Sequence, residues 1–134
     1  NNASFTETLL SDVSFTGCKL TGAAFLRSKA MGVRFADCLM SDARLPGFSF
    51  RKAQLVQVDF SLADLAGCDF RDAVFDGSSL REANLTGARF EGADLRGADL
   101  GGLRLTDAAR FKGATVSRRQ AADLLAQLGL LVAN

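Results

Sequence analysis

Residues 88–100 read ARFEGADLRGADL, a stretch in which one five-residue motif is repeated. Each copy of this motif is called a word below. In each word an alanine is followed two positions later by a leucine or a phenylalanine, and a glycine often stands two positions after that. A fixed period that spans several words is the first sign of a repeat architecture. The extent of this period along the chain therefore decides the fold.

The period continues without a slip from Phe5 to Leu105. Of the 21 residues found at every fifth position in this range, ten are Leu, nine are Phe, and the other two are Ala30 and Met40. Two positions earlier, ten of the 21 residues are Ala, and two positions later ten are Gly and five are Asp. Low-complexity sequence does not keep such a register while its residues vary, so the period describes a fold.

A period of five residues predicts a coil of short extended segments. In an α-helix the apolar stripe would wind around the surface, because five is not a multiple of 3.6. In a flat strand successive large apolar residues would alternate between faces, because five is odd. A corner after each Leu or Phe restores the parity, and Gly and Asp are residues that accept such corners. The sequence therefore predicts an all-β solenoid with the Ala and the Leu or Phe inside.

The clearest words are ADLAG at 63–67, ANLTG at 83–87, ADLRG at 93–97 and ADLGG at 98–102. They match the consensus A(D/N)LxG, and the chain from residue 3 to about 107 resembles the pentapeptide-repeat family. The resemblance implies a right-handed quadrilateral β-helix with four words per coil, hence about five coils. The period alone also permits a triangular coil.

With four words per coil, residues twenty apart stack on one another. Ser28 and Ala30 then leave a shortage of core volume beneath Phe48 and Phe50, and we expect the oversized Phe48 to fill the gap left by Ala30. The residues expected to build the core include Phe48, Phe50, Ala30, Leu95 and Leu100.

Three cysteines without a CxxC motif favour a reducing compartment over a disulfide framework, and we expect a cytoplasmic protein. Cys18 and Cys38 would stack, whereas Cys68 faces the opposite wall. The stacking permits a Cys18–Cys38 bridge, but buried free thiols acting as small apolar residues are the favoured interpretation.

The last segment breaks the period and predicts a short C-terminal α-helix. Ser117 and Gln120 have the spacing of a capping box, and Gly129 is placed to end the helix with Leu130 folded back on Leu125. We therefore divide the chain into a repeat region, 1–112, and a C-terminal capping or dimerisation segment of helix and strand, 113–134.

The tail QAADLLAQLGLLV, 120–132, resembles the C-termini of pentapeptide-repeat proteins that protect bacterial topoisomerases from quinolones. That resemblance implies a homodimer joined tail to tail, while the alternative is a simple cap on the open end of the solenoid. The residues expected at the dimer interface are Leu124, Leu125, Leu128, Leu130, Leu131 and Val132.

The composition argues against an enzyme. The chain has no His, its thiols fall at inward positions, and an unbroken repeat offers no obvious closed pocket, so we predict no catalytic residue, no metal site and no cofactor. The longest apolar stretch, LLAQLGLLVA, is too short to cross a membrane and contains Gln127. The start at Asn1 and the exposed first coil at Phe5 suggest an upstream segment with further repeats.

The topoisomerase-protecting members of the family are thought to imitate duplex DNA with an acidic rod. Five coils make a rod of about 24 Å, and duplex DNA of that length carries about fourteen phosphates. Residues 3–112 hold 14 acidic and 14 basic residues, so any DNA-like character must be local. When the words are assigned to sides in fours, one side carries the expected acidic face, Asp42, Asp59, Glu82 and Asp99, against Lys19 and Arg81.

A second side is predominantly basic. Its cations, Lys29, Arg51, Lys52, Arg71, Arg89, Arg110 and Lys112, outnumber its anions, Asp12, Asp69, Asp72 and Glu91. No aromatic side chain accompanies these cations for base stacking, which disfavours direct nucleic-acid binding.

Three hypotheses follow for the function. The first, which follows from the resemblance of the tail, is a non-enzymatic interaction protein that protects or modulates DNA gyrase by DNA mimicry, as in fluoroquinolone resistance. The second is a structural or scaffolding solenoid with another bacterial protein partner. The third is direct nucleic-acid binding through the basic face. None of them involves a small-molecule substrate or a membrane.

Overall fold

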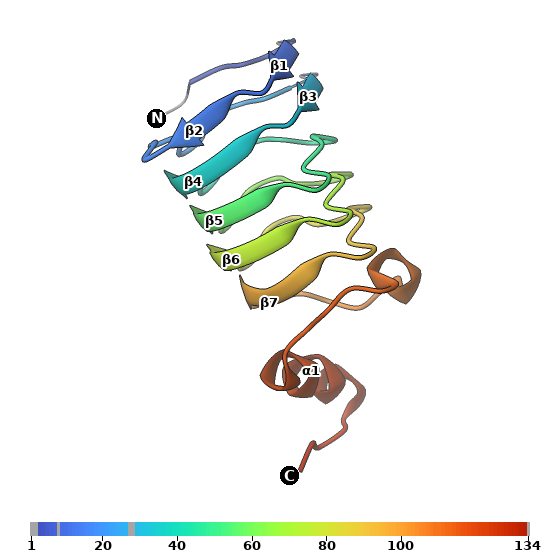
Figure 1. Ribbon diagram of the computed structural model, residues 1–134. Helices are drawn as coiled ribbons and strands as arrows, with labels where there is room; N and C mark the ends of the chain where they lie inside the picture. Colours follow the sequence, from blue (N-terminus) through green and yellow to red (C-terminus); the bar gives the residue numbers. More distant parts are fainter. Residues whose placement is uncertain (1–2, 8, 27–28, 134) are drawn as a thin grey trace.

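A computed structural model describes residues 3–7, 9–26 and 29–133 of the chain (Figure 1). Its strands stack as successive coils of one solenoid, and the C-terminal helix lies beyond the last strand. The elements are β1 (Leu9–Ser11), β2 (Ser14–Thr16), β3 (Lys29–Met31), β4 (Arg34–Leu39), β5 (Gln54–Asp59), β6 (Val74–Ser79), β7 (Asp94–Asp99), the 3-10 helix η1 (Ala108–Phe111), α1 (Arg118–Leu125) and the 3-10 helix η2 (Ala126–Leu128).

All strand pairs are parallel, and the pairing register fixes the number of words per coil. The larger sheet has the order β2-β4-β5-β6-β7, and a smaller one pairs β1 with β3. Phe35 pairs with Leu55 and Leu55 with Phe75, so that one coil takes twenty residues. Four words per coil make the chain a right-handed quadrilateral solenoid, as the resemblance implied, and rule out a triangle.

The corners lie where the sequence predicts them. The residue two positions after each large inward residue has a positive φ throughout the described range from Glu7 to Gly102, with Gly97 as the exception. Nine of these corner residues are not glycine, and they include Leu62 with φ of 60°. Gly97 is required for a different reason. A Cβ there would lie 2.7 Å from the Phe75 carbonyl oxygen, at a register irregularity between β6 and β7.

The core consists of the inward Ala and Leu or Phe residues. Phenylalanines 50, 70, 90 and 111 stack with ring centroids 4.9, 5.0 and 5.1 Å apart, which matches the spacing between coils. Phe48 is buried against the rings of Phe25 and Phe50. Leu95 is buried, whereas Ala30 and Leu100 are partly buried at its margin. Ser28 lies outside the described residues, so the filling of the Ala30 gap by Phe48 stays a prediction.

Two features of the last coil differ from the expectation. The strict period places Arg110 at the next inward position, but one extra residue enters the coil and Phe111 stacks on Phe90 instead. Ala114 and Val116 also pack against the core.

The solenoid makes about four turns, slightly fewer than the five coils expected. Its last coil is completed by the 3-10 helix η1 rather than by a regular strand.

The C-terminal helix begins as predicted, but α1 ends at Leu125, and Gly129 ends the 3-10 helix η2 that follows it. The Ser117 hydroxyl accepts a hydrogen bond from the Gln120 amide, and the Gln120 side chain accepts one from the Ser117 amide, which completes the capping box. Gly129 has φ of 78°, and the Leu130 amide donates to the Leu125 carbonyl. Within the described residues, 130–133 form no strand, so the extended strand expected after the helix is not present.

Candidate protein-interaction site

The aspartates of the repeat first shape the corners of the coil. Asp59 Oδ1 accepts a hydrogen bond of 2.9 Å from the Ser61 amide, and Asp99 Oδ1 accepts one of 3.0 Å from the Gly101 amide. The same bond, from the amide two residues on, recurs at Asp64, Asp69 and Asp94. Such bonds are a common reason for aspartate at turns. The sequence analysis missed this role, although the spacing of aspartate and corner signalled it.

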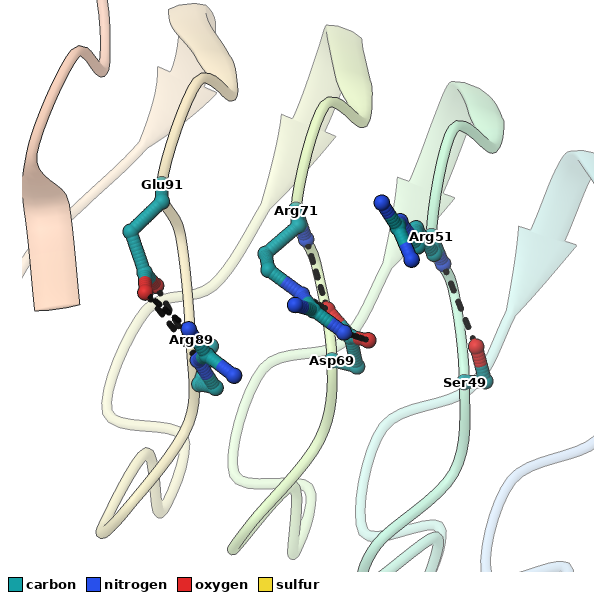
Figure 2. A network of polar contacts seen from close by, with 6 residues as sticks. All are labelled: Ser49, Arg51, Asp69, Arg71, Arg89 and Glu91. Atoms are coloured by element: carbon teal, nitrogen blue, oxygen red, sulfur yellow. Dashed lines mark hydrogen bonds and ion pairs between the residues drawn. The ribbon is translucent and has the colours of Figure 1, made fainter.

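Arginines neutralise most of these aspartates and Glu91. Arg71 binds Asp69 at 2.8 Å, Arg96 binds Asp94 at 2.8 Å, and Arg89 binds Glu91 through Nε at 3.0 Å. The hydrogen bond from each arginine holds the pKa of its partner carboxyl below the ordinary value. Two of these pairs, Asp69–Arg71 and Arg89–Glu91, lie side by side on adjoining coils (Figure 2). Each of these pairs therefore contributes little net charge to the surface.

On the predicted acidic face, fewer of the carboxylates form ion pairs. Asp99 is paired there, because Arg81 Nε lies 2.9 Å from its Oδ2 and lowers its pKa. Among the described residues, no ion pair forms to Asp42, Asp59 or Glu82. Asp42 and Glu82 occupy exposed corners, and Asp59 ends β5. Three of the four predicted acids therefore present uncompensated charge.

Two further aspartates extend this face. Asp37 and Asp76 belong to the neighbouring side when words are simply counted, but β4 and β6 run on through the corner toward the acidic face. Both side chains are exposed and form no ion pair in the described part of the chain. The sequence analysis missed them because the continuity of these strands cannot be counted from the period. We call Asp37, Asp42, Asp59, Asp76 and Glu82 the acidic surface.

Exposed leucines lie on the same side as the acids. Leu39 is 45% exposed and pairs in register with Asp59. Leu62 is 60% exposed and occupies the corner between those of Asp42 and Glu82 in the adjoining coils. These leucines place exposed apolar side chains beside the acids.

The basic face is partly neutralised. Arg71, Arg89 and Arg110 pair with Asp69, Glu91 and Asp107, respectively. The cations without an ion pair in the described part are Arg51, Lys52 and Lys112. The side chain of Lys29 lies outside the described residues. The positive charge is therefore interrupted along this face rather than continuous.

Two glutamines attach the C-terminal segment to the solenoid. Gln120 Nε2 donates to the carbonyl oxygens of Leu95 at 2.6 Å and Ala98 at 2.9 Å, and thus satisfies two acceptors of β7, the last strand of the sheet. Gln127 Nε2 donates to the Leu103 carbonyl oxygen at 2.5 Å, and its Oε1 accepts from the Leu105 amide. The sequence predicted the capping box but not this second function of Gln120.

The outer side of the tail is apolar and open to solvent. Of the residues expected at a dimer interface, Leu124 is half-buried on the inner side of α1. The other five are exposed, and the exposed fractions are 37% for Leu125, 74% for Leu128, 52% for Leu130, 97% for Leu131 and 55% for Val132.

The cysteines are free thiols. Cys68 donates to the Leu45 carbonyl oxygen at 2.9 Å, and burial raises its pKa to about 12. In the described ranges, His, Cys, Asp and Glu side chains form no group of three able to hold a metal ion. No helix among the described residues combines the length and the apolarity needed to cross a membrane.

The sequence model of the pentapeptide-repeat family matches residues 1–37, 34–72 and 63–102, with eight copies of the repeat in all. The chain belongs to the pentapeptide-repeat family. The structure is similar to that of the pentapeptide-repeat protein Rfr23 from the cyanobacterium Cyanothece 51142, with 19% identity, 82% of this chain and 88% of that chain covered, and a TM-score of 0.67.

Two other pentapeptide-repeat structures are less similar. A protein from Nostoc is 28% identical over 87% of this chain and 83% of its own, with a TM-score of 0.48. QnrB1, described as a plasmid-mediated fluoroquinolone resistance protein, is 18% identical over 100% of this chain and 95% of its own, with a TM-score of 0.35. No curated protein matches the sequence. The match to the family model shows the family, and the similarity to Rfr23 shows the fold.

Proposed function

We propose that this pentapeptide-repeat chain is a non-enzymatic, protein-binding rod whose acidic surface docks on the DNA-binding groove of DNA gyrase. The observation that carries the proposal is the uneven pairing of carboxylates. Asp42, Asp59 and Glu82 form no ion pair in the described part of the chain and lie together on one side of the coil. On the other sides Asp69, Glu91 and Asp94 are neutralised by arginines, and the acids left without an ion pair there, such as Asp12, Asp64 and Asp72, are spread over different sides. Unpaired carboxylates on a rigid scaffold attract a basic groove over long range.

The size of this surface supports partial rather than complete mimicry of DNA. Five stacked strands span about 19 Å, and duplex DNA of that length carries about eleven phosphates. The acidic surface supplies five unpaired carboxylates, so it would replace the DNA over part of the groove. The exposed Leu39 and Leu62 would add apolar contacts that a DNA backbone does not offer. The resemblance of the tail at 120–132 to topoisomerase-protecting proteins favours gyrase as the partner.

We further propose that a second copy of the chain covers the C-terminal tail. The tail exposes Leu128, Leu131 and Val132, which lie within five residues of one another in the sequence. Burial of such side chains against an equivalent surface releases water from both copies, which is the dominant favourable term in homodimer formation. Joining two rods at this end would double the length available to a partner.

A supercoiling assay with purified gyrase and a fluoroquinolone tests the proposed function. The chain should protect or inhibit gyrase, and a variant with Asp42→Asn, Asp59→Asn and Glu82→Gln should lose most of that effect. Asp12→Asn, Asp64→Asn and Asp72→Asn together form the matched control, because they remove three charges from equivalent corner and strand positions on other sides. An equal loss in both variants, or no effect of the chain at micromolar concentration, would contradict the proposal. A scaffolding role with another partner would then be favoured.

A further inference from the structure

A hollow lies on the basic face beside Ala30. Ala30 stands at an inward position that elsewhere holds Leu, Phe or Met, and Gly32 follows at the corner. One hollow of about 340 Å³ is bordered by Ala30, Gly32, Ser49, Arg51 and Lys52. A second, of about 610 Å³, shares Gly32, Arg51 and Lys52 and extends to Arg34 and Asp12. Because the two share these lining residues, we treat them as one hollow. Its volume falls in the range of small-ligand sites.

The pairing of arginines changes at this coil. In two successive coils the side chain two positions from the arginine, on the same segment, is a carboxylate, as in Asp69–Arg71 and Glu91–Arg89. In the preceding coil, Ser49 takes the place of the acid (Figure 2). Ser49 Oγ accepts only from the Arg51 backbone amide, at 3.5 Å, and no ion pair forms to the Arg51 guanidinium in the described part of the chain. Arg51 therefore presents its donors to the hollow.

Asp69, in the next coil, does not compensate Arg51. Both of its carboxylate oxygens accept hydrogen bonds from Arg71, at 2.9 and 2.8 Å. The Arg71 hydrogen bond is also the largest cause of the lowered pKa of Asp69, and the charge of Arg51 contributes less. The acid is thus already held by another guanidinium.

The charges around the hollow do not cancel. Arg34, Arg51 and Lys52 border it, and Asp12 is the carboxylate among its described lining residues, which leaves an excess of two positive charges, three minus one. Among the described residues, Arg34 and Lys52 form no ion pair. A concave surface lined by one sign of charge concentrates the opposite ion, and guanidinium donors fit the geometry of phosphate oxygens.

We propose that this hollow binds one small phosphate-type oxyanion, with the Arg51 guanidinium as the main donor and Lys52 and Arg34 as flanking charges. The structure favours a small ligand over a nucleic-acid strand, because the arginines of the next two coils are neutralised by Asp69 and Glu91. A strand would need several consecutive phosphate contacts along the face. The site is separate from the acidic surface and does not depend on gyrase binding.

Isothermal titration calorimetry with pyrophosphate at low salt tests the site. The chain should bind one pyrophosphate saturably. Ser49→Asp recreates the Asp69–Arg71 arrangement around Arg51, and it should weaken binding about tenfold, since a charge-assisted contact is lost. Asp12→Asn removes the opposing charge and should strengthen binding several-fold. Arg104→Gln, an exposed cation outside the hollow, is the matched control and should change nothing.

Ser49→Asp and Asp12→Asn should change the affinity for pyrophosphate in opposite directions, so the test does not depend on a single variant. Far-UV circular dichroism verifies that each variant keeps the fold. Absence of saturable binding by the wild-type chain would overturn the proposal, and so would equal weakening by Ser49→Asp and Arg104→Gln, since binding would then follow net charge alone. Tight binding of a 20-base single-stranded DNA that Ser49→Asp leaves unchanged would also overturn it, in favour of a nucleic-acid surface along the whole face.

Discussion

Replacement of Phe70 by alanine tests whether the stacked phenylalanine rings hold the coils together. Phe70 is fully buried, and its ring stacks between those of Phe50 and Phe90 at 4.9 and 5.0 Å. Removing a buried phenylalanine side chain costs about 3–5 kcal/mol. Each aromatic pair contributes about 0.5–1.5 kcal/mol beyond its buried area. Because Phe70 has a ring on both sides, we expect a loss in the upper part of this range, about 4–5 kcal/mol.

Phe111→Ala is the matched control. Phe111 stacks on one ring, that of Phe90 at 5.1 Å, and it is only partly buried at the end of the column. We expect about half the loss, roughly 2 kcal/mol. Phe70→Leu, which keeps most of the apolar volume, should cost about 1–2 kcal/mol and guards against complete unfolding of the alanine variant.

Urea unfolding followed by far-UV circular dichroism measures these free energies. Fluorescence is a poor probe here, because the chain has no Trp and no Tyr. The midpoints should fall in the order wild type, Phe70→Leu, Phe111→Ala and Phe70→Ala, with the first two variants close together. If Phe70→Ala lost no more stability than Phe111→Ala, the coils would not depend on continuous ring stacking, and the reasoning would be refuted.

Three further predictions concern the cap, a corner and the tail. Gln120→Leu should cost about 2–3 kcal/mol of unfolding free energy, at about 1 kcal/mol for each of its three hydrogen bonds; an unchanged urea midpoint would contradict the role of Gln120 as a cap. Leu62→Gly should raise stability by about 0.5–1 kcal/mol, since relief of about 1–2 kcal/mol of left-handed strain exceeds the added flexibility of glycine; a lower melting temperature would contradict this. Leu128→Glu with Leu131→Glu should give a 14.2 kDa monomer by light scattering, whereas Leu9→Glu at the other end should leave a dimer; an unchanged mass in the double variant would place the interface elsewhere.

The period was sufficient to predict the interior and the corners. An inward residue every fifth position specifies the parallel coil, and the Gly and Asp positions specify the positive φ values that the corners require. The start of the helix at Arg118 and the turn at Gly129 could be predicted because the capping box and the glycine are local signals. These features depend on residues that are close together in the sequence.

Features that depend on neighbouring coils could not be predicted from the period. The extra residue before Phe111 shifts the stacking from twenty to twenty-one residues, which the Phe90–Phe111 stacking and the pairing between Asp94 and Thr115 reveal. The double role of Gln120 depends on carbonyl oxygens more than twenty residues away. Likewise, Asp99 counts as an acid in the sequence, but Arg81 from the preceding coil neutralises it. Charge counts per side therefore overstate the acidity that a partner meets.

Direct binding to gyrase is the measurement that tests the central claim most closely. The fluorescently labelled chain is titrated with purified gyrase, with and without a duplex that gyrase binds. We predict saturable binding that the duplex displaces, and weaker binding by the variant with Asp42→Asn, Asp59→Asn and Glu82→Gln. The variant with Asp12→Asn, Asp64→Asn and Asp72→Asn should bind as the wild type does. Failure to saturate at about 10 μM gyrase, or binding that the duplex does not displace, would contradict the claim that the acidic surface occupies the DNA-binding groove.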